Sequence, residues 1–362
     1  MKELKFKFDM QRFATTTIPQ SLVQMAWARD TWNTGVQESY FSKFMGNNAR
    51  SVIQVREELS KGDGTKIRIP LLMPLTGAGI TGDNMLEGNE EALIYRDFDV
   101  ELQRVRNAVR LAGKFEEHKT QINMRKDAKN GLSEWLSKYI DCAIFSVLTG
   151  VLSTELNWTS STFPFPLEAP SADRVLIANG RSAESGITAS DKFSTDIIGM
   201  AKRKAVENAD TRIRPINVDG KATYVMVIDQ WQARDLKSDT KWLESQQQGN
   251  VRGEKNPIFS GALGMWDGVV IHENNRIPRT ATGATSGDTN VKVSHALFLG
   301  AQACVFAEGE AAEWNEKTFD YGNQYGVSFG RMFGLQKSKF KFDGTNYTDF
   351  GVINVLTSSV DD

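Results

Sequence analysis

Residues 59–111 contain a long excursion that a single compact domain could hardly enclose. A first limb at residues 66–72 and a return limb at residues 97–103 alternate charged and apolar side chains, as paired strands do. The tip between them, residues 75–89, has glycine at positions 77, 79, 82 and 88. A glycine-rich tip of this length is uncommon inside a compact domain. We therefore predict a projecting β-hairpin that gains its order from a partner.

Two details refine the predicted hairpin. Pro70 and Pro74 have no N–H to donate to a ladder, so the first limb is expected at a sheet edge or outside the sheet. The alternation of the return limb shifts by one residue at Arg104–Val105, and a β-bulge is the simplest cause of such a shift.

The strongest single element in the sequence is a helix that ends before Gly150. Its apolar positions follow the i, i+3, i+4, i+7 spacing of a helix with one buried face: Leu132, Trp135, Leu136, Tyr139, Ile140, Ala143, Ile144, Val147 and Leu148. We expect it to begin near Thr120 and to span about 45 Å at about 1.5 Å per residue. Gly150 stands where a C-terminal cap belongs.

The remaining sequence divides into an α/β region and a late strand region. For residues 171–312 we predict helices at 194–209 and 230–246 and strands at 223–228 and 268–272. The apolar run at residues 296–306 fits a strand or a helix, and its periodicity does not decide between them. Residues 313–362 show the pattern of long strands.

Residues 1–50 are expected to form an arm rather than a domain. The segment is rich in aromatic side chains that it can hardly bury within itself, so they must lie on another surface, in this chain or in a neighbour: Phe6, Phe8, Phe13, Trp27 and Trp32. A short helix at residues 22–45 packed on the body of the same chain is the alternative.

Composition limits the class of protein. The 362 residues include 43 Lys and Arg and 45 Asp and Glu, a net charge of −2, whereas a dedicated DNA-binding domain usually carries a basic stripe. Two cysteines make no disulfide framework and fit a reducing compartment. The start of the chain has no apolar signal region, and the apolar stretches are too short to cross a bilayer. We expect a soluble protein made in a cytosol, with no membrane partner.

No residue pattern predicts catalysis, a cofactor or a metal ion. Residues 77–82 match G-x-G-x-x-G, but the acidic residues that follow would repel a phosphate. The same segment lacks the terminal glutamate of a calcium loop, because Ile94 stands at that position. The three histidines have no metal-ligand spacing. Catalytic, cofactor-binding and metal residues are therefore predicted as none.

Three lysines alternate with other residues near the C-terminus: Lys337, Lys339 and Lys341. On a strand they would share one face. Two interpretations stay open, a solvated edge that resists aggregation and a basic strip that faces the phosphates of DNA.

Several segments, in this order, resemble the major capsid proteins of tailed phages and prophages, in the branch typified by coliphage N-four. The most specific is residues 82–92, GDNMLEGNEEA, and the similarity runs through most of the chain. The other matching segments are residues 8–14, 41–46, 61–63, 259–264, 267–269, 319–324 and 349–353.

The resemblance implies the α+β, Hong Kong-97-like major capsid fold. It divides the chain into an N-terminal arm (1–50), an extended loop with its flanking strands (51–111), a peripheral domain with a long spine helix (112–170), an axial domain (171–312), and C-terminal strands that return to the peripheral domain (313–362). Arm and loop would contact neighbouring subunits, the loop through Leu86, Glu87, Glu90 and Glu91.

The implied function is a shell. Copies would form hexamers and pentamers of an icosahedral phage head around packaged double-stranded DNA, with a portal as a further partner. Because only about 50 residues precede the expected loop, a separate scaffolding protein is implied. The protein would be found in the host cytoplasm before assembly and then in the virion capsid.

Two other functions remain as alternatives. An encapsulin-like nanocompartment of related fold would enclose protein cargo rather than DNA. An α/β enzyme would use residues 75–89 as a lid, although the catalytic residues that it needs are not apparent.

Overall fold

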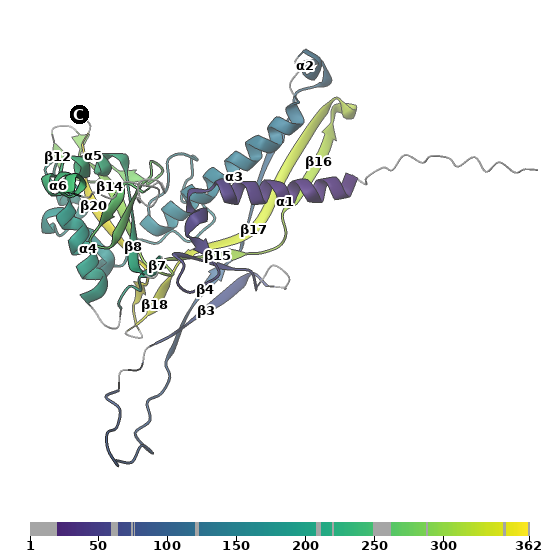
Figure 1. The fold of residues 1–362 in the computed structure, drawn as a ribbon. Helices are drawn as coiled ribbons and strands as arrows, with labels where there is room; N and C mark the ends of the chain where they lie inside the picture. Colours follow the sequence, from purple (N-terminus) through teal and green to yellow (C-terminus); the bar gives the residue numbers. More distant parts are fainter. Residues whose placement is uncertain are drawn as a thin grey trace, which may run out of the picture.

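The computed structural model describes residues 20–58, 64–73, 75, 77–119, 123–207, 211–218, 221–248, 262–286, 289–342 and 345–360. Figure 1 shows three parts: a lobe around one sheet, an elongated part with two long helices beside a second sheet, and a hairpin that projects away from both. None of the helices among these residues is long and apolar enough to cross a bilayer.

The elongated part is built on a six-stranded sheet with the strand order β1-β2-β15-β17-β16, in which β5 also pairs with β17. Its strands are β1 (Met45–Gly46), β2 (Ile53–Arg56), β5 (Gln103–Arg110), β15 (Cys304–Glu308), β16 (Glu313–Phe319) and β17 (Gln324–Lys337). The helices α1 (Gln20–Glu38) and α3 (Met124–Thr149) pack together beside this sheet, and the short helix η1 (Tyr40–Phe44) follows α1.

The helix α3 confirms the predicted apolar stripe, because Leu132, Leu136 and Ile140 are buried in one core with the six-stranded sheet. Its start lies later than predicted. Asn123 caps the helix by accepting a hydrogen bond from the backbone N–H of Lys126, and a separate short helix, α2 (Lys114–Lys119), precedes it. Gly150 caps the C-terminal end with φ of 74°, a conformation that favours glycine.

The lobe contains an eight-stranded sheet of order β6-β20-β14-β8-β10-β9, with β11 added to β14 and β7 to β8. Its strands are β6 (Val175–Ile177), β7 (Ile216–Val218), β8 (Lys221–Ile228), β9 (Gly264–Trp266), β10 (Val269–Glu273), β11 (Arg279–Thr280), β14 (Lys292–Leu299) and β20 (Val352–Ser359). A small ribbon of β12 (Thr285–Ser286) and β13 (Thr289–Asn290) lies beside it.

The helices of the lobe pack against this sheet. They are α4 (Thr195–Glu207), α5 (Gln230–Ser238) and α6 (Thr240–Gln248). The predicted helix at 194–209 and the strands at 223–228 and 268–272 are confirmed. The predicted single helix at 230–246 is wrong, because it breaks at Asp239, whose carboxylate accepts hydrogen bonds from the N–H and hydroxyl of Thr195.

The predicted domain boundary at residues 312/313 does not match the sheets. The apolar run at 296–306 holds the end of β14 in one sheet and the start of β15 in the other. The strand β20 pairs with β14 and β6, so the C-terminus returns to the lobe rather than to the elongated part. Two segments of the chain approach each other closely here, because a Cβ atom on Gly351 would lie 2.7 Å from the backbone of Ala303.

The projecting hairpin pairs β3 (Lys66–Leu72) with β4 (Tyr95–Glu101) in a sheet of their own. This agrees with the position predicted from Pro70, outside a larger sheet. The inner side chains of the hairpin pack on Phe340 and Phe350, near a second ribbon of β18 (Lys339–Lys341) and β19 (Tyr347–Asp349). The predicted bulge at Arg104–Val105 is wrong. The alternation shifts because the strand breaks at Leu102, where it leaves β3 and joins β17.

Candidate assembly surfaces

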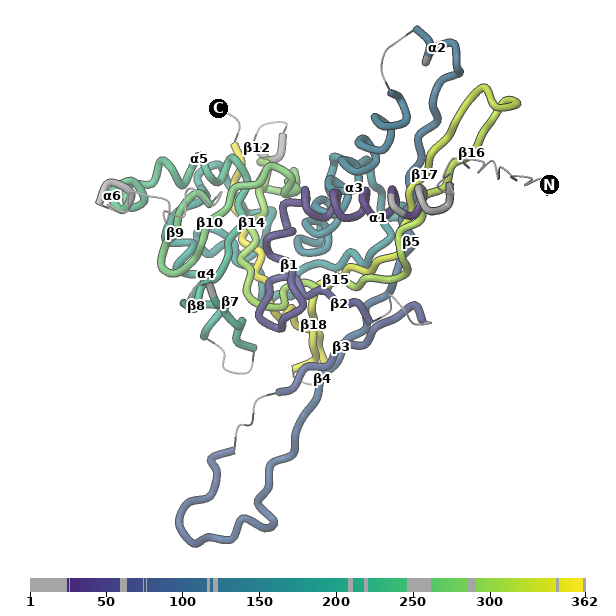
Figure 2. Tube along the Cα trace, turned by 45° about the vertical axis from the view of Figure 1, so that its right-hand side comes forward, coloured from purple at the N-terminus to yellow at the C-terminus, as the bar shows by residue number. Residues whose placement is uncertain are grey.

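The tip of the hairpin is the most exposed apolar segment of the described chain. We call residues 77–94 the loop tip. The side chains of Met85 and Leu86 are 72% and 63% exposed, and Leu93 and Ile94 are also largely exposed. Both views show the loop tip pointing away from the two sheets (Figures 1 and 2). Apolar side chains without a core around them mark a surface that a partner covers.

Several hydrogen bonds of the loop tip are made within the loop itself. Glu91 accepts from the backbone N–H of Gly77 at 2.8 Å, and Glu90 accepts from the N–H of Gly88 at 2.8 Å. A Cβ atom added at Gly79, Gly82 or Gly88 would meet nothing within 4 Å, and all three have positive φ. These glycines therefore provide a backbone conformation that other residues rarely adopt, and no side chain packs at their Cα positions.

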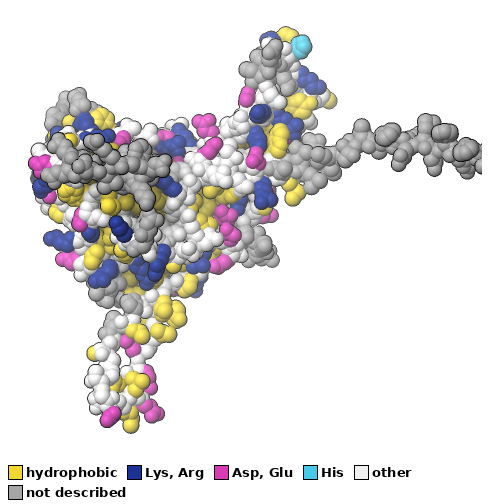
Figure 3. Space-filling model, viewed as in Figure 1, with side chains coloured by type: hydrophobic (Ala, Val, Ile, Leu, Met, Phe, Trp, Pro, Cys, Tyr) yellow, Lys and Arg dark blue, Asp and Glu magenta, His cyan; other side chains and the backbone are white. Residues whose placement is uncertain are grey.

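The loop tip is also acidic. Residues 75–94 include Asp83, Glu87, Glu90 and Glu91 and no lysine or arginine. In the space-filling view, acidic and apolar side chains alternate along the projection (Figure 3). The four predicted loop contacts, Leu86, Glu87, Glu90 and Glu91, are all exposed, and their contact with a neighbour stays a prediction.

The predicted contact of Trp32 with a neighbouring subunit is wrong. Trp32 is 5% exposed and packs against the stacked rings of Phe306 and Phe333 in the six-stranded sheet. The guanidinium of Arg331 lies 3.7 Å from its ring centre. The residue lies on the buried side of α1, and the alternative of a short helix packed on the body describes it better.

Trp27 lies one turn earlier and is half-buried. Its ring meets Trp314 edge-on at 5.7 Å and lies under the guanidinium of Arg125 at 4.6 Å. Trp27 thus has intrachain contacts that the sequence did not reveal, and a further contact with a neighbour stays a prediction. Phe6, Phe8 and Phe13 lie outside the described residues.

The lysine strip does not form one exposed face. Lys337 ends β17 with its side chain 3% exposed, and its ammonium lies 3.0 Å from the Asp349 carboxylate. Lys339 pairs with Glu168. Lys341 lies above the Tyr347 ring at 4.8 Å. The prediction that Lys337 faces DNA is therefore wrong, because the strand breaks at Ser338 and an acidic partner covers the ammonium.

A buried carboxylate joins the two parts of the chain. Asp141 of α3 accepts hydrogen bonds from the Ser39 hydroxyl at 2.6 Å and the Tyr40 N–H at 3.1 Å, and its other partner is Arg276 of the lobe at 2.5 Å. Burial raises the pKa of Asp141 above its ordinary value, although these partners oppose the shift. The contact ties η1, α3 and the segment after β10 together.

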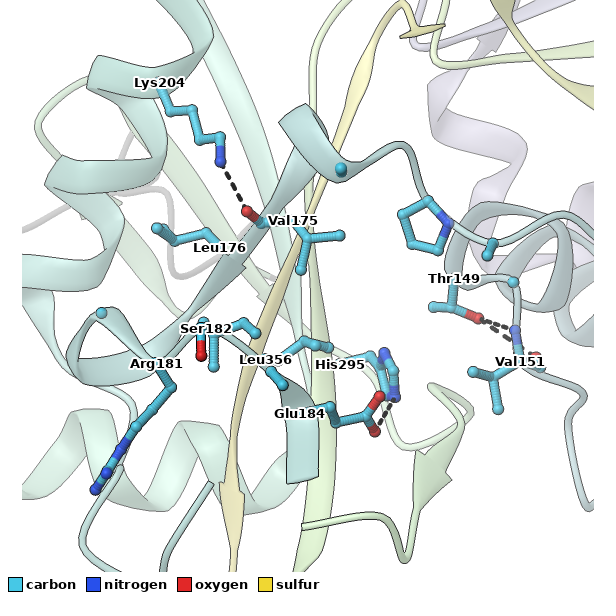
Figure 4. A pocket seen from close by; sticks show the side chains of 17 residues that line it. Thr149, Val151, Val175, Leu176, Arg181, Ser182, Glu184, Lys204, His295 and Leu356 are labelled. Carbon is cyan, nitrogen blue, oxygen red and sulfur yellow. Dashed lines mark hydrogen bonds and ion pairs between the residues drawn. The ribbon is translucent and has the colours of Figure 1, made fainter. Parts of the chain in front are cut away.

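A cavity of about 590 Å³ lies where the end of α3 meets the lobe. Figure 4 shows Glu184 and His295 facing each other within it. Two of its polar groups have partners in the chain: Lys204 donates to the Val175 carbonyl at 2.7 Å, and Glu184 accepts from Thr280 at 2.5 Å. The Nδ1 atom of His295 is buried and has no hydrogen-bond partner among the described residues. No group of acidic, histidine or cysteine side chains among the described residues is arranged to hold a metal ion.

Comparison with known proteins identifies the family to which this chain belongs. The family model described as "Phage capsid protein" matches residues 3–361. The chain belongs to the phage capsid protein family. It is also 32% identical to the major capsid protein of Pseudomonas phage KPP25, over 96% of this chain and 97% of that protein. The chain is thus a major capsid protein of a phage head.

Solved capsid structures share the whole fold of this capsid protein. The capsid of Ralstonia phage GP4 has a TM-score of 0.78 at 26% identity and covers 99% of both chains. The capsid of cyanophage Pam1 has a TM-score of 0.72 at 20% identity and covers 100% of both chains. The α+β, Hong Kong-97-like fold is confirmed, whereas the branch typified by coliphage N-four stays a prediction.

The sequence did not reveal a second projecting end of this capsid protein. The turn η7 (Asp320–Gly322) joins β16 to β17, and its Tyr321 has φ of 49° and a fully exposed ring. Phe115 of α2 is also 72% exposed. This end lies opposite the loop tip (Figures 1 and 2). A signal was present, because Tyr321-Gly322 interrupts an aromatic strand pattern where a turn fits.

Proposed function

We propose that copies of this capsid protein form hexamers and pentamers that close an icosahedral head around packaged double-stranded DNA. The observation that carries the proposal is the loop tip, whose apolar side chains are exposed in the single subunit and whose glycines at positions 79, 82 and 88 have open space around them. A partner must cover this surface, and in a shell of identical subunits the nearest partner is another copy.

Two sheets give the subunit the parts that such a shell needs. We assign the eight-stranded sheet with α4 to α6 to the axial domain, at the centre of a capsomer. The six-stranded sheet with α3 as the spine helix is assigned to the peripheral domain. The sheet pairing supports a revised division, in which β15 belongs to the peripheral domain and β20 to the axial domain.

The energetics favour many moderate contacts over one tight interface. A stable pairwise interface buries about 1,200–2,000 Å² in total, whereas a shell divides its contacts among several neighbours. Closure of a ring and then of a shell makes each further contact intramolecular, so weak pair contacts suffice through avidity. Contact with DNA is expected to be non-specific, since the net charge of −2 gives the shell little general affinity for phosphate.

Further partners belong to the same proposal. A scaffolding protein would guide assembly in the host cytoplasm, and a portal would occupy one vertex of the head. An enzymatic function is not proposed, and no observation favours protein cargo over DNA.

Sedimentation and electron microscopy of the full chain test the proposal. We expect the purified protein to form capsomers or shells as its concentration rises. A variant in which residues 78–92 are replaced by a short Gly-Ser turn should keep the cooperative melt of the native chain but stay small. A native chain that remains a monomer at every concentration, with its scaffolding protein present, would contradict the proposal.

A further inference from the structure

The cavity at the end of α3 has no function in the shell as described so far. We call it the junction cavity, because its walls come from the end of α3 on one side and from β6, α4, β14 and β20 of the lobe on the other. Its volume of about 590 Å³ lies within the range of about 300–1,000 Å³ that is typical of small-molecule sites. Arg181, Ser182 and Ala183 line it and are exposed, so its rim reaches the solvent.

Much of the wall of the junction cavity is apolar. The strand β6 contributes Val175, Leu176 and Ile177, and all three are only partly buried although they stand in a strand of the large sheet. Val151 and Leu356 add further apolar side chains to the wall. A concave apolar wall with a few polar groups is the usual form of a site for a small organic molecule.

One polar atom in this wall is buried without a partner. His295 of β14 is 4% exposed, and its Nδ1 atom makes no hydrogen bond among the described residues. Figure 4 shows one ring nitrogen of His295 facing Glu184 and the other turned away from it. Buried polar atoms nearly always have a hydrogen-bond partner, so the free nitrogen marks a place where a partner from outside the chain would be bound.

The neighbours of His295 determine what its Nδ1 can do. The Thr280 hydroxyl donates to Glu184 at 2.5 Å, so its oxygen is left as an acceptor. The Nε2 atom of His295 lies 3.3 Å from that oxygen and 4.0 Å from the Glu184 carboxylate. Since Nε2 faces two acceptors, it carries the ring proton.

The second nitrogen of the ring is therefore an acceptor. Burial lowers the pKa of His295 below its ordinary value, although Glu184 opposes the shift. The ring is thus neutral at pH 7, and its Nδ1 offers a lone pair rather than a proton. A partner for this atom must bring a hydrogen-bond donor.

The charges around the junction cavity favour a neutral partner. Lys204 and Glu184 both line it, so an anion would meet the carboxylate and a cation would meet the ammonium. The guanidinium of Arg181 points away from His295 (Figure 4) and pairs with Asp191 at 3.1 Å. A neutral molecule meets no like charge in this wall.

We propose that the junction cavity binds a small neutral molecule with an apolar body and one hydroxyl or N–H group, which donates a hydrogen bond to Nδ1 of His295. The apolar body would lie against β6 and Leu356. This inference goes beyond the proposed function and does not depend on it. Because the ligand would contact the end of α3 and the lobe together, its binding should stabilise the folded subunit.

Three probes of similar shape test the chemistry of the site in the full native chain, dispersed as subunits at pH 7. They are 2-naphthol with a donor, 2-methoxynaphthalene without one, and the anion 2-naphthoate. By titration calorimetry we expect 2-naphthol to bind at least about tenfold more tightly than either other probe, because it alone satisfies the buried acceptor. It should also raise the melting temperature. Tighter binding of 2-naphthoate would mean an anion site and would overturn the inference.

Two variants locate the bound probe. His295→Phe keeps a ring but removes the acceptor, so it should bind 2-naphthol and 2-methoxynaphthalene equally. Ala183→Trp fills the junction cavity from its exposed rim, where the fold has room, and should weaken binding of 2-naphthol at least about tenfold with an unchanged melt. The matched control is Ala189→Trp, at an exposed position outside the cavity, and should bind as the native chain does. An Ala183→Trp chain with native affinity would overturn the inference.

The remaining outcomes separate this inference from the proposed function. If the native chain binds none of the probes at millimolar concentration, the junction cavity holds only water and the inference fails. If dispersed subunits bind 2-naphthol but assembled shells do not, a neighbouring copy fills the cavity and the inference also fails. Neither result affects the proposed function, which fails only if the native chain forms no capsomer or shell.

Discussion

The helix α1 and the loop tip both carry apolar side chains that the sequence predicted to meet a neighbour, yet they behave differently. In α1, Ala28 and Trp32 are buried against α3 and the six-stranded sheet. In the loop tip, Met85 and Leu86 stay exposed, and no residue of the core packs on them. Aromatic or apolar content alone therefore does not identify an assembly surface.

Backbone structure explains the difference. A helix places every third or fourth side chain on one side, so α1 can bury a stripe against its own chain. The loop tip has neither helix nor strand, and its glycines at positions 79, 82 and 88 adopt positive φ with no neighbour. A segment of that kind has no repeating side to bury, and its apolar residues gain a core only from a second molecule.

The largest expected effect comes from Trp32→Ala. Removing this ring from its place against Phe306 and Phe333 leaves a cavity and should lower the free energy of unfolding by about 3–5 kcal/mol. Met25→Ala is the matched control, because Met25 lies on the same helix and is 69% exposed. Chemical denaturation of both variants measures the difference. If Trp32→Ala left stability unchanged but prevented assembly, Trp32 would belong with the loop tip after all.

The next largest effect is expected from Lys337→Met. The ammonium of Lys337 is buried beside Asp349, and removing one partner of a buried pair costs about 3–5 kcal/mol because the other charge is left behind. Asp349 keeps the backbone N–H of Ser171 as a donor, so we expect the lower end of that range. Lys341→Met, at a half-buried position, should change the unfolding free energy far less. A stable Lys337→Met variant with reduced DNA retention would restore the DNA-facing interpretation.

Local signals in the sequence predicted local structure well. The apolar stripe that starts at Leu132, the cap at Gly150 and the strand at residues 223–228 each depend on neighbours within a few residues, and each is confirmed. The resemblance supplied the overall fold. The loop tip was also predictable, because its glycines and acids exclude a regular element.

Long-range pairing was not predictable. Nothing near residues 300–303 indicates that β14 and β15 join different sheets, or that β20 returns to β14. Strand partners that are distant in sequence depend on the packing of the whole chain rather than on local propensity. The same limit explains Lys337, whose buried partner Asp349 lies beyond a turn.

A second loop sharpens the comparison, because the chain organises it without a partner. Residues 178–191 of the lobe are held by Asp191, which accepts from the N–H of Thr188 at 2.8 Å, Asn179 at 2.5 Å and Arg181 at 3.1 Å. Burial opposes ionisation of Asp191, but these bonds outweigh it and hold the pKa of the carboxyl below its ordinary value.

Asp191→Asn should therefore have a pH-dependent effect. A carboxyl whose pKa is lower in the folded state than in the unfolded state stabilises the fold at pH values above the ordinary aspartate pKa. This stabilisation is lost as the pH falls through the pKa of the folded state. We expect a loss of about 1–3 kcal/mol at pH 7, from hydrogen bonds to a charged group, and a smaller difference from the native chain in acid. Asp196→Asn, on the exposed side of α4, is the control. The urea unfolding midpoints of the native chain and the two variants at pH 7, 5 and 3.5 measure the pH dependence. A stability loss of Asp191→Asn that is equal at all three pH values would contradict the prediction.

The smallest effect on stability is expected at the loop tip, from Met85→Ser with Leu86→Ser. Both side chains are exposed in the subunit, so the free energy of unfolding should change by less than about 0.5 kcal/mol. Assembly should nevertheless fail, because each subunit repeats the lost contact around every ring and the deficits add up across the shell. Leu243→Ser, an exposed apolar position on α6, should change neither property. A loop variant that unfolds more easily than the native chain would mean that the loop tip packs on its own subunit, and the contrast with α1 would disappear.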